Sequence, residues 1–295
     1  MATTAGPIPR PAHRYRVPEL LQDIRLLDLL ELSGTTVRAS QLLNLSQPTV
    51  SRRYRTLAQD FGLERRPRQL QCCRYGASEA MRWLRMGCRA HRLEAGVARI
   101  GTDLFHQPLL AGMDWLLPVP TRFRTIQSWA DLVREGVLDG ALVSGLELQT
   151  AGTAELGGLQ WVELGRTSLA LAMSQRHGDA CSPSMPPVLV PNRGVAPGLQ
   201  RALQSQGLDL QSVGLSCTTA ETWLDHLQAR PVAMPVFTWP AAMASWSGAL
   251  NRLPLPRPLS CAVGLLLPEG PQLQGLLGRM LEPWMRQLAG AGASS

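Results

Sequence analysis

The chain has 295 residues, 45% of them hydrophobic, which allows two domains or three compact units with packed cores. It carries a formal net charge of +7 with a pI near 9.7, and all 29 of its basic residues are arginine. No apolar run reaches the length of a membrane span, and the N-terminus lacks the apolar centre of a secretory signal, so we expect neither a membrane-spanning nor a secreted protein.

The positive charge is confined to the first third of the chain. Residues 1–100 hold 17 arginines against 8 acidic residues, whereas residues 101–295 hold 12 against 14. A basic module beside a nearly neutral one is typical of a DNA-binding domain joined to a domain of a different kind. At the front, residues 1–17 combine prolines with arginines and are predicted to form a flexible arm.

The next predicted elements are two short helices joined by tight turns. A leucine stripe within residues 26–30 gives the first helix, which Ser33-Gly34 ends. Thr35 or Thr36 can cap the second helix, and Asn44-Leu45 supplies the turn after it.

A third helix is predicted to begin at Ser46, a good N-cap residue, with Pro48 in its first turn. Gly62 is a plausible stop. Its buried face would consist of Val50, Tyr54, Leu57 and Phe61, which recur at helical spacing. The opposite face carries side-chain types that bond to base edges and phosphates, namely Gln47, Thr49, Ser51, Arg52, Arg53 and Arg55. This pattern indicates a helix-turn-helix; the alternative is an ordinary helical hairpin within a core.

The runs Gly34–Ser40, GTTVRAS, and Ser46–Ser51, SQPTVS, resemble the N-terminal helix-turn-helix of the LysR-type transcriptional regulators. The resemblance covers about forty residues. It implies an α/β protein in which residues 18–77 form a winged helix-turn-helix, followed by a long linker helix and a two-lobed effector domain of periplasmic-binding-protein type. It also implies a cytoplasmic regulator that binds double-stranded DNA as a homodimer or tetramer. Such a regulator would respond to a small, anionic effector, with RNA polymerase as a candidate partner.

A wing is expected over residues 63–75, where Leu70 and Cys72 alternate as in a strand. The run Leu63–Pro67 departs from the family, which usually has a Leu-Phe pair and then Arg, so the wing's shape and the roles of its arginines stay open. The residues expected to contact DNA are Thr36, Arg38, Ser46, Gln47, Pro48, Thr49, Ser51, Arg52, Arg53, Arg55, Arg65, Arg66 and Arg68. Among them, Arg38 is expected to hold a phosphate.

Residues 78–105 are predicted to be the linker, with Ser78 capping a helix that runs to about residue 101. Its apolar seam would contain Met81, Leu84, Cys88, His91, Leu93, Val97 and Ile100, while Arg82, Arg85, Arg89 and Arg92 would keep part of the helix charged. The resemblance implies that this helix pairs with its twin in a symmetric dimer. The alternative is a helix packed only within its own chain.

Residues 106–290 read as strands alternating with helices, which predicts open α/β layers, with residues 291–295 as a tail. Strands are expected at 109–112, 137–143, 168–173, 188–190, 232–234 and 261–267, and helices at 129–136, 199–206, 221–228 and 273–288. The resemblance implies that the chain crosses between two lobes twice. Between residues 118 and 138 the chain is about a dozen residues short of what the family uses, so we expect a strand or helix to be absent there.

An effector in such a fold is expected between the lobes, at strand ends and helix N-termini. Asn192 and Arg193 follow a predicted strand, and Thr218 and Thr219 precede a predicted helix. Arg193 could pair with a carboxylate that the hydroxyl groups orient. The alternative is a surface arginine beside ordinary helix caps.

The sequence contains no nucleophile elbow, phosphate-binding loop or metal-ligand cluster, and its six cysteines fit no zinc pattern. We therefore expect no catalysis, metal or cofactor. Two other hypotheses stay open: a DNA-binding scaffold that has lost effector binding, and a helix-turn-helix fused to a catalytic α/β domain.

Overall fold

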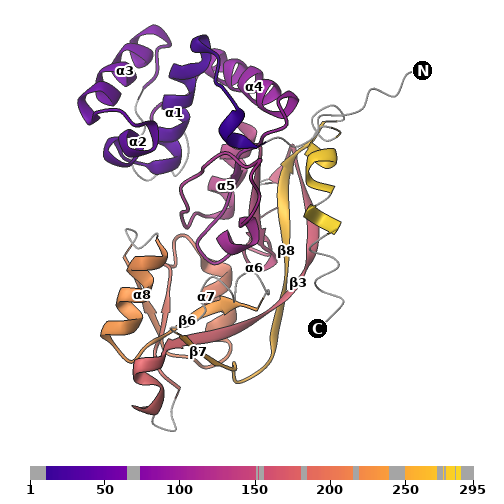
Figure 1. Cartoon of the computed structure of the whole chain (residues 1–295). Helices are drawn as coiled ribbons and strands as arrows, with labels where there is room; N and C mark the ends of the chain where they lie inside the picture. Colours follow the sequence, from indigo (N-terminus) through magenta and orange to yellow (C-terminus); the bar gives the residue numbers. More distant parts are fainter. Residues whose placement is uncertain are drawn as a thin grey trace.

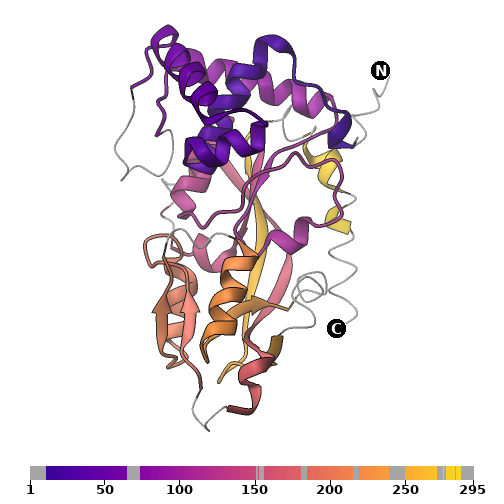
Figure 2. The same ribbon diagram turned by 60° about the vertical axis from the view of Figure 1, so that its left-hand side comes forward.

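The computed structural model describes residues 11–64, 74–150, 152, 156–180, 185–214, 219–238, 250–270, 275, 277–282 and 284–286. Both ribbon views show a helical module at one end of an elongated α/β body (Figures 1 and 2). Within these ranges, no helix has the length and apolar character needed to span a membrane.

The helical module contains the three predicted helices, α1 (Gln22–Ser33), α2 (Thr36–Leu43) and α3 (Gln47–Asp60). Leucines of α1, together with Val50 and Leu57 of α3, form its core. The turns between the helices are those that the sequence predicts, because Gly34 and Asn44 adopt the left-handed conformation at φ +72° and +53°. Thr35 is the cap of α2, since its Oγ1 accepts a hydrogen bond from the backbone N–H of Arg38.

Residues 11–17 of the predicted arm lie within the described part of the chain, and its flexibility stays a prediction. Residues 12–14 form a short 3-10 helix, η1 (Ala12–Arg14), and a second, η2 (Glu19–Leu21), precedes α1. The Tyr15 hydroxyl lies 3.0 Å from Nδ1 of His91, and the two rings are in contact. A half-buried aromatic pair therefore attaches this segment to α4.

The linker helix, α4 (Glu79–Glu94), begins as predicted, with Ser78 as its N-cap, but it ends well before residue 101. Gly96, at φ +73°, is in the left-handed region that stops a helix. Val97 and Ile100 do not continue the helical seam, because the chain turns there into the first strand of the body. The predicted helical length of this segment is therefore wrong.

The body is built on one mixed eight-stranded sheet with the order β1-β2-β8-β3-β6-β4-β5, and β7 pairs with β3 off this path. Its strands are β1 (Ile100–Gly101), β2 (Gly140–Ser144), β3 (Leu159–Ser174), β4 (Val188–Val190), β5 (Leu210–Ser212), β6 (Ala233–Phe237), β7 (Leu250–Leu253) and β8 (Leu259–Pro268). Its helices are η3 (Gln107–Leu110), α5 (Ile126–Arg134), α6 (Gly145–Leu148), η5 (Gln175–Ala180), α7 (Pro197–Gln204) and α8 (Ala220–Ala229). Residues 277–282 and 284–286 are also helical, in agreement with the predicted last helix.

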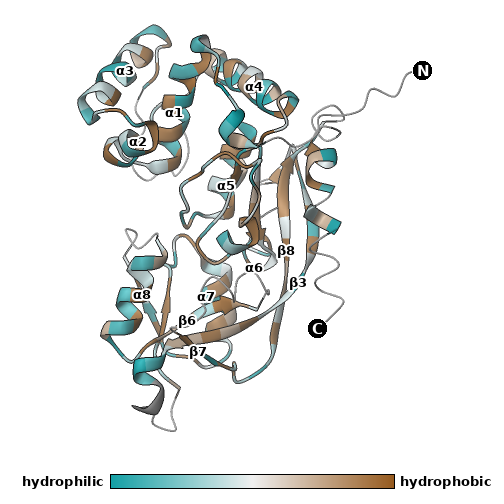
Figure 3. Ribbon diagram, viewed as in Figure 1, coloured by the Kyte–Doolittle hydropathy of each residue, from teal (hydrophilic) through white to brown (hydrophobic). Residues whose placement is uncertain are grey.

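The long antiparallel strands β3 and β8 join two lobes, which confirms the two expected crossings (Figure 1). In the first lobe β8 pairs with β2, and in the second lobe β3 pairs with β6 and β7. Buried apolar side chains follow both long strands, which appear brown over much of their length in Figure 3. A continuous core of this kind makes the two lobes one packed body.

The first lobe differs from the prediction. The strand expected at 109–112 is instead part of η3, and Leu116 forms only an isolated bridge with Ala98. Pro108 and the left-handed Gly112, at φ +78°, explain why this segment does not pair as a strand. Between β1 and α5 the described residues contain only this short 3-10 helix, and between residues 118 and 138 they contain α5; the expected shortening of that stretch relative to the family stays a prediction.

Candidate DNA-binding surface and ligand cavities

The start of α3 is a capped and exposed helix end. Ser46 Oγ accepts a hydrogen bond from the backbone N–H of Thr49 at 3.3 Å and lies 2.8 Å from the Thr49 hydroxyl. Nε2 of Gln47 donates to Oγ1 of Thr36 at 3.1 Å, which brings the beginnings of α2 and α3 together. Four of the predicted DNA-contacting residues therefore form one surface.

The two faces of α3 divide as predicted. Val50 and Leu57 are buried, and Tyr54 and Phe61 pack against the same core. On the opposite face the exposed residues are Ser46, Gln47, Pro48, Arg52 and Arg55, with Thr49, Ser51 and Arg53 partly exposed. The helix ends at Asp60, and Gly62 shortly after it, at φ +58°, matches the predicted stop.

Arg53 differs from its neighbours because it is already paired. Its guanidinium lies 2.6 Å from the carboxylate of Asp23 on α1, with 38% and 46% of the two side chains exposed. An ion pair this exposed contributes about 0–1 kcal/mol, so a DNA phosphate can compete for the arginine.

A basic cluster that the sequence did not reveal lies beside α2. Arg122, from the loop before α5, reaches the helical module so closely that a Cβ on Gly34 would clash with its guanidinium. Burial lowers the pKa of Arg122, and the charges of Arg38 and Arg74 lower it further. Three arginines from three segments therefore meet at the beginning of α2.

The predicted wing arginines Arg65, Arg66 and Arg68 lie outside the described residues. The ends of that segment are fixed, because Leu63 and Tyr75 are both buried in the core of the helical module. A Cβ on Gly76 would lie 2.5 Å from Cβ of Leu63, so the two ends meet closely. Leu63 and Gly76 thus lie side by side in the module.

The helical module is fastened to the body through Asp28 of α1. Its carboxylate accepts hydrogen bonds from Nε of Arg85 at 2.8 Å and from Nη1 of Arg99 at 2.6 Å. All three side chains are buried. Arg124 adds a second connection by donating to the carbonyl oxygens of Glu31 and Leu32 at the end of α1.

A second buried cluster joins α4 to Asp139, the residue before β2. Arg92 donates to both carboxylate oxygens of Asp139, at 2.6 and 3.1 Å, and Arg89 lies 3.5 Å away. Burial alone would raise the pKa of Asp139, but the charge and hydrogen bonds of Arg92, with the charge of Arg89, hold it below its ordinary value. Burial lowers the pKa of Arg89 to about 10, so this residue is still a cation at neutral pH.

Around Phe105 and His106 the space between the lobes is filled by aromatic side chains. Phe105 of the first lobe packs against Trp223 of the second, with 5.4 Å between ring centroids, and His106 stacks on Phe237 at 4.5 Å. The cavity left there measures about 20 Å³, which is room for about one water molecule. An anionic effector has no space at this position.

The helix N-terminus that such an anion would use is also taken. The carboxylate of Glu147, on α6, accepts hydrogen bonds from the backbone N–H groups of Gly198 and Leu199 at 3.1 and 2.8 Å. A Cβ on Gly198 would lie 2.0 Å from the carbonyl oxygen of Leu146, so the lobes touch backbone to backbone. The first turn of α7 therefore binds an anion from its own chain.

The described members of the predicted effector set are not among the residues that line the two cavities, although Thr219 directly precedes Ala220, which lines the larger one. Asn192 and Arg193 are exposed, and Oδ1 of Asn192 accepts from the backbone N–H of Gly194. Thr219 is the N-cap of α8, and Thr218 is outside the described residues. The described ones do not line either cavity, and their contacts match the alternative of turn and cap residues.

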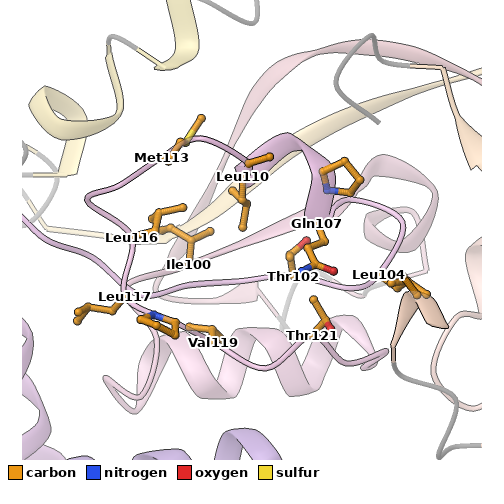
Figure 4. A pocket seen from close by; sticks show the side chains of 14 residues that line it. Ile100, Thr102, Leu104, Gln107, Leu110, Met113, Leu116, Leu117, Val119 and Thr121 are labelled. Carbon is orange, nitrogen blue, oxygen red and sulfur yellow. The ribbon is translucent and has the colours of Figure 1, made fainter. Parts of the chain in front are cut away.

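A much larger cavity, of about 470 Å³, lies mainly in the first lobe against β1 and the loop that follows it, and Ala220 of α8 in the second lobe also lines it (Figure 4). Ile100, Leu104, Leu110 and Leu116 are among the apolar residues that line it. None of the residues that line it is charged. The described part of the chain also contains no group of three or more His, Cys, Asp or Glu side chains that could hold a metal ion.

No protein-family model matches the chain, and no curated protein sequence matches it. Among solved structures, it is similar to ArgP from Mycobacterium tuberculosis, with 19% identity over 92% of this chain and 97% of that one at a TM-score of 0.49. It is also similar to CbnR, a LysR family transcriptional regulator, with 14% identity over 91% and 99% of the two chains at a TM-score of 0.48. HinK, a LysR family transcriptional regulator from Pseudomonas aeruginosa, matches with 16% identity over 91% and 98% at a TM-score of 0.45.

Proposed function

We propose that this protein is a sequence-specific, DNA-binding transcriptional regulator of LysR type that acts in the cytoplasm. The observation that carries the proposal is the capped start of α3, where Gln47 and Arg52 are exposed and Thr36 of α2 is hydrogen-bonded to Gln47. An exposed helix end with amide and guanidinium groups has the chemistry that reads base edges in the major groove.

The residues around this helix end would hold the DNA backbone. Arg38 and Arg122 lie at the beginning of α2, where guanidinium groups can bind phosphate oxygens. Thr36, Ser46 and Thr49 supply hydroxyl groups on the same side. The wing arginines Arg65, Arg66 and Arg68 would add phosphate contacts. In this arrangement the base contacts specify the site and the phosphate contacts position the protein on it.

The proposal can be tested by selecting duplexes from a random library with the full-length protein and then measuring the affinity of variants for the selected operator. We expect Gln47→Ala and Arg52→Ala each to weaken operator binding by about 1–3 kcal/mol, or roughly 5- to 150-fold, and the double variant to abolish specific binding. Sequence-specific binding that survives both substitutions would show the proposal to be wrong.

Gln59 provides a matched control, because it is an exposed glutamine at the opposite end of the same helix. Gln59→Ala should leave operator affinity within about twofold of the wild type, since a surface substitution away from the interface changes energies by about 0.5 kcal/mol or less. A loss equal to that of Gln47→Ala would mean that the start of α3 has no special role.

We also propose that the protein is a homodimer formed through the part of α4 that its own chain leaves uncovered. Trp83 on this helix is 63% exposed, and nothing lies within 4 Å of a Cβ added to Gly87 one turn later. A second copy packed there would bury an aromatic side chain and bring two α3 helices to one DNA duplex. A tetramer would need further contacts, and RNA polymerase is a candidate partner of the DNA-bound form.

Sedimentation velocity tests the dimer. Trp83→Glu should shift the protein to monomers, whereas Met185→Glu, which changes a residue of 40% exposure on the second lobe, should not. A Trp83→Glu protein that remains fully dimeric would contradict the proposed interface.

The closed space between the lobes favours a second candidate function, a DNA-binding scaffold with no effector. Phe105 and Trp223 occupy that space, and Glu147 occupies the α7 N-terminus. Thermal shift measurements with small carboxylates separate the two candidates, because a ligand that binds the native state raises its melting temperature. A shift with a carboxylate would favour an anion-responsive regulator; the scaffold predicts none.

A further inference from the structure

The 470 Å³ cavity beside β1 has room for a small molecule. Its size falls within the range of about 300–1,000 Å³ that is common for ligand pockets. The loop after β1, which borders the cavity, contains only η3 and an isolated bridge between Ala98 and Leu116.

The lining of this cavity is apolar over most of its surface. In the view of Figure 4, Met113, Leu116 and Leu117 lie at one end. None of the fourteen residues that line it carries a charge. An ionised carboxylate or amine buried here would lose its hydration without gaining an opposite charge, which costs several kcal/mol.

The opposite end of the cavity is polar. Thr102 and Gln107 lie together there in the view of Figure 4, with Thr121 on the same side. The Thr102 hydroxyl donates to the carbonyl oxygen of Leu142, which leaves its oxygen free to accept a hydrogen bond from a ligand. The Gln107 amide is exposed at this end and can both donate and accept.

We propose that this cavity binds an uncharged, mainly apolar small molecule that carries one hydroxyl or amide group at the Thr102 and Gln107 end. The ligand class differs from the anion expected from the sequence, because the lining lacks any cation. Only a regulatory role for this ligand rests on the proposed function; the binding of the ligand to the cavity does not.

Both walls of the cavity continue into contacts with the helical module. Ile100 lines the cavity next to Arg99, which is paired with Asp28 of α1 at 2.6 Å. Thr121 lines it next to Arg122, which lies against Gly34. A ligand that displaces either wall would therefore act within one residue of a contact that positions the helix-turn-helix.

The test uses the full-length protein and the uncharged dye N-phenyl-1-naphthylamine, whose fluorescence rises in apolar surroundings. We expect saturable binding of one dye per chain. In competition, 1-naphthol should displace the dye at concentrations about tenfold or more below those needed with 1-naphthoate, which has the same rings but an ionised carboxylate; tenfold corresponds to about 1.4 kcal/mol. Absence of saturable binding, or preference for 1-naphthoate, would overturn the proposal.

Two substitutions locate the site. Ala111 lines the cavity and is exposed, so Ala111→Phe should fill it and weaken dye binding about tenfold or more without unfolding the protein. Ala229→Phe, at the exposed end of α8, is the matched control and should leave dye binding unchanged. Dye binding that survives Ala111→Phe in a folded protein would place the site elsewhere and overturn the proposal.

The result is separable from the proposed function. Dye binding needs no DNA, and operator affinity is measured with the Gln47→Ala and Arg52→Ala variants without dye. If the dye does not bind while these variants lose operator binding, the cavity proposal fails and the regulator proposal stands. If the dye binds while these variants keep operator binding, the cavity proposal stands and the regulator proposal fails.

Discussion

Two exposed arginines of α3 differ sharply from three buried arginines of α4. On α3, Arg52 and Arg55 are exposed at the surface. On α4, Arg85, Arg89 and Arg92 are buried and held by Asp28 and Asp139. The first set can bind an external anion, whereas the second has its anions built into the chain.

The difference lies in the neighbouring elements and not in the residue type. Arginine stays charged at neutral pH, so a buried one needs a carboxylate or carbonyl oxygens around it. Arg89 donates to the carbonyl oxygens of Val133 and Leu138, and Arg92 donates to that of Gly136. Segments of the body far from α4 in the sequence thus turn a charged helix face into an internal connection.

Removing the anion of the buried cluster is expected to have the largest effect. Asp139→Asn leaves Arg92 and Arg89 buried without their counter-charge, which should cost about 3–5 kcal/mol of unfolding free energy. Urea denaturation followed by circular dichroism measures this. The control Asp131→Asn breaks the half-exposed pair with Arg134 and should cost about 0–1 kcal/mol. Equal losses would remove the distinction between buried and surface pairs.

Acid should reproduce part of that loss. Because the folded protein holds the pKa of Asp139 below its unfolded value, this carboxylate stabilises the fold above the unfolded pKa of about 3.9, and the contribution is lost as pH falls through the folded pKa. The stability gap between wild type and Asp139→Asn should therefore be constant from pH 7 to about pH 5. Below about pH 3.9 it should shrink by up to about 1.4 kcal/mol per pH unit.

Glu31 and Glu147 titrate with the opposite sign, since burial raises the pKa of each. Their contribution to stability is present below the unfolded pKa and is lost as pH rises through the folded pKa. Both are present in wild type and in Asp139→Asn, so they cancel in the difference. A gap that widens as the pH falls from 5 to 3 would contradict the role given to Asp139.

Alanine substitutions in the two arginine sets test whether binding and stability are divided between them. Arg52→Ala should lower operator affinity by about 1–3 kcal/mol and leave the free energy of unfolding within about 0.5 kcal/mol of the wild type. Arg89→Ala should instead lower the free energy of unfolding, because it leaves Asp139 with one cation fewer in a buried cluster. Measurement of both quantities on both variants decides this. Loss of stability in Arg52→Ala would break the division.

Local signals in the sequence predicted the helix-turn-helix well. Ser46, Gly34, Asn44 and Gly62 act on their own neighbours, so caps and turns could be placed without the rest of the fold. The strands at 188–190 and 261–267 were predicted for a similar reason, since each lies in an apolar run.

Features that depend on distant segments could not be predicted. Periodicity treated Arg85, Arg89 and Arg92 as the charged side of α4, because nothing near them in the sequence reveals Asp28 and Asp139 as partners. The location of Arg122 could not be predicted either, since only the fold brings its loop to Gly34. The closure of the space between the lobes depends on Phe105 and Trp223, whose contact spans both lobes.

Arg122 gives the smallest expected effect and tests where the two regions meet. It belongs to the body, but it lies beside Arg38, so we expect it to bind one phosphate of the operator. Arg122→Ala should reduce the slope of log affinity against log salt concentration by about 0.9, the value for one phosphate contact on duplex DNA, and should weaken binding equally for all sequences. Arg201→Ala, an exposed arginine on α7, should leave the slope unchanged. If Arg122→Ala also left the slope unchanged, the DNA-binding surface would end at the helical module, and the body would act on DNA only through the buried pairs of Asp28.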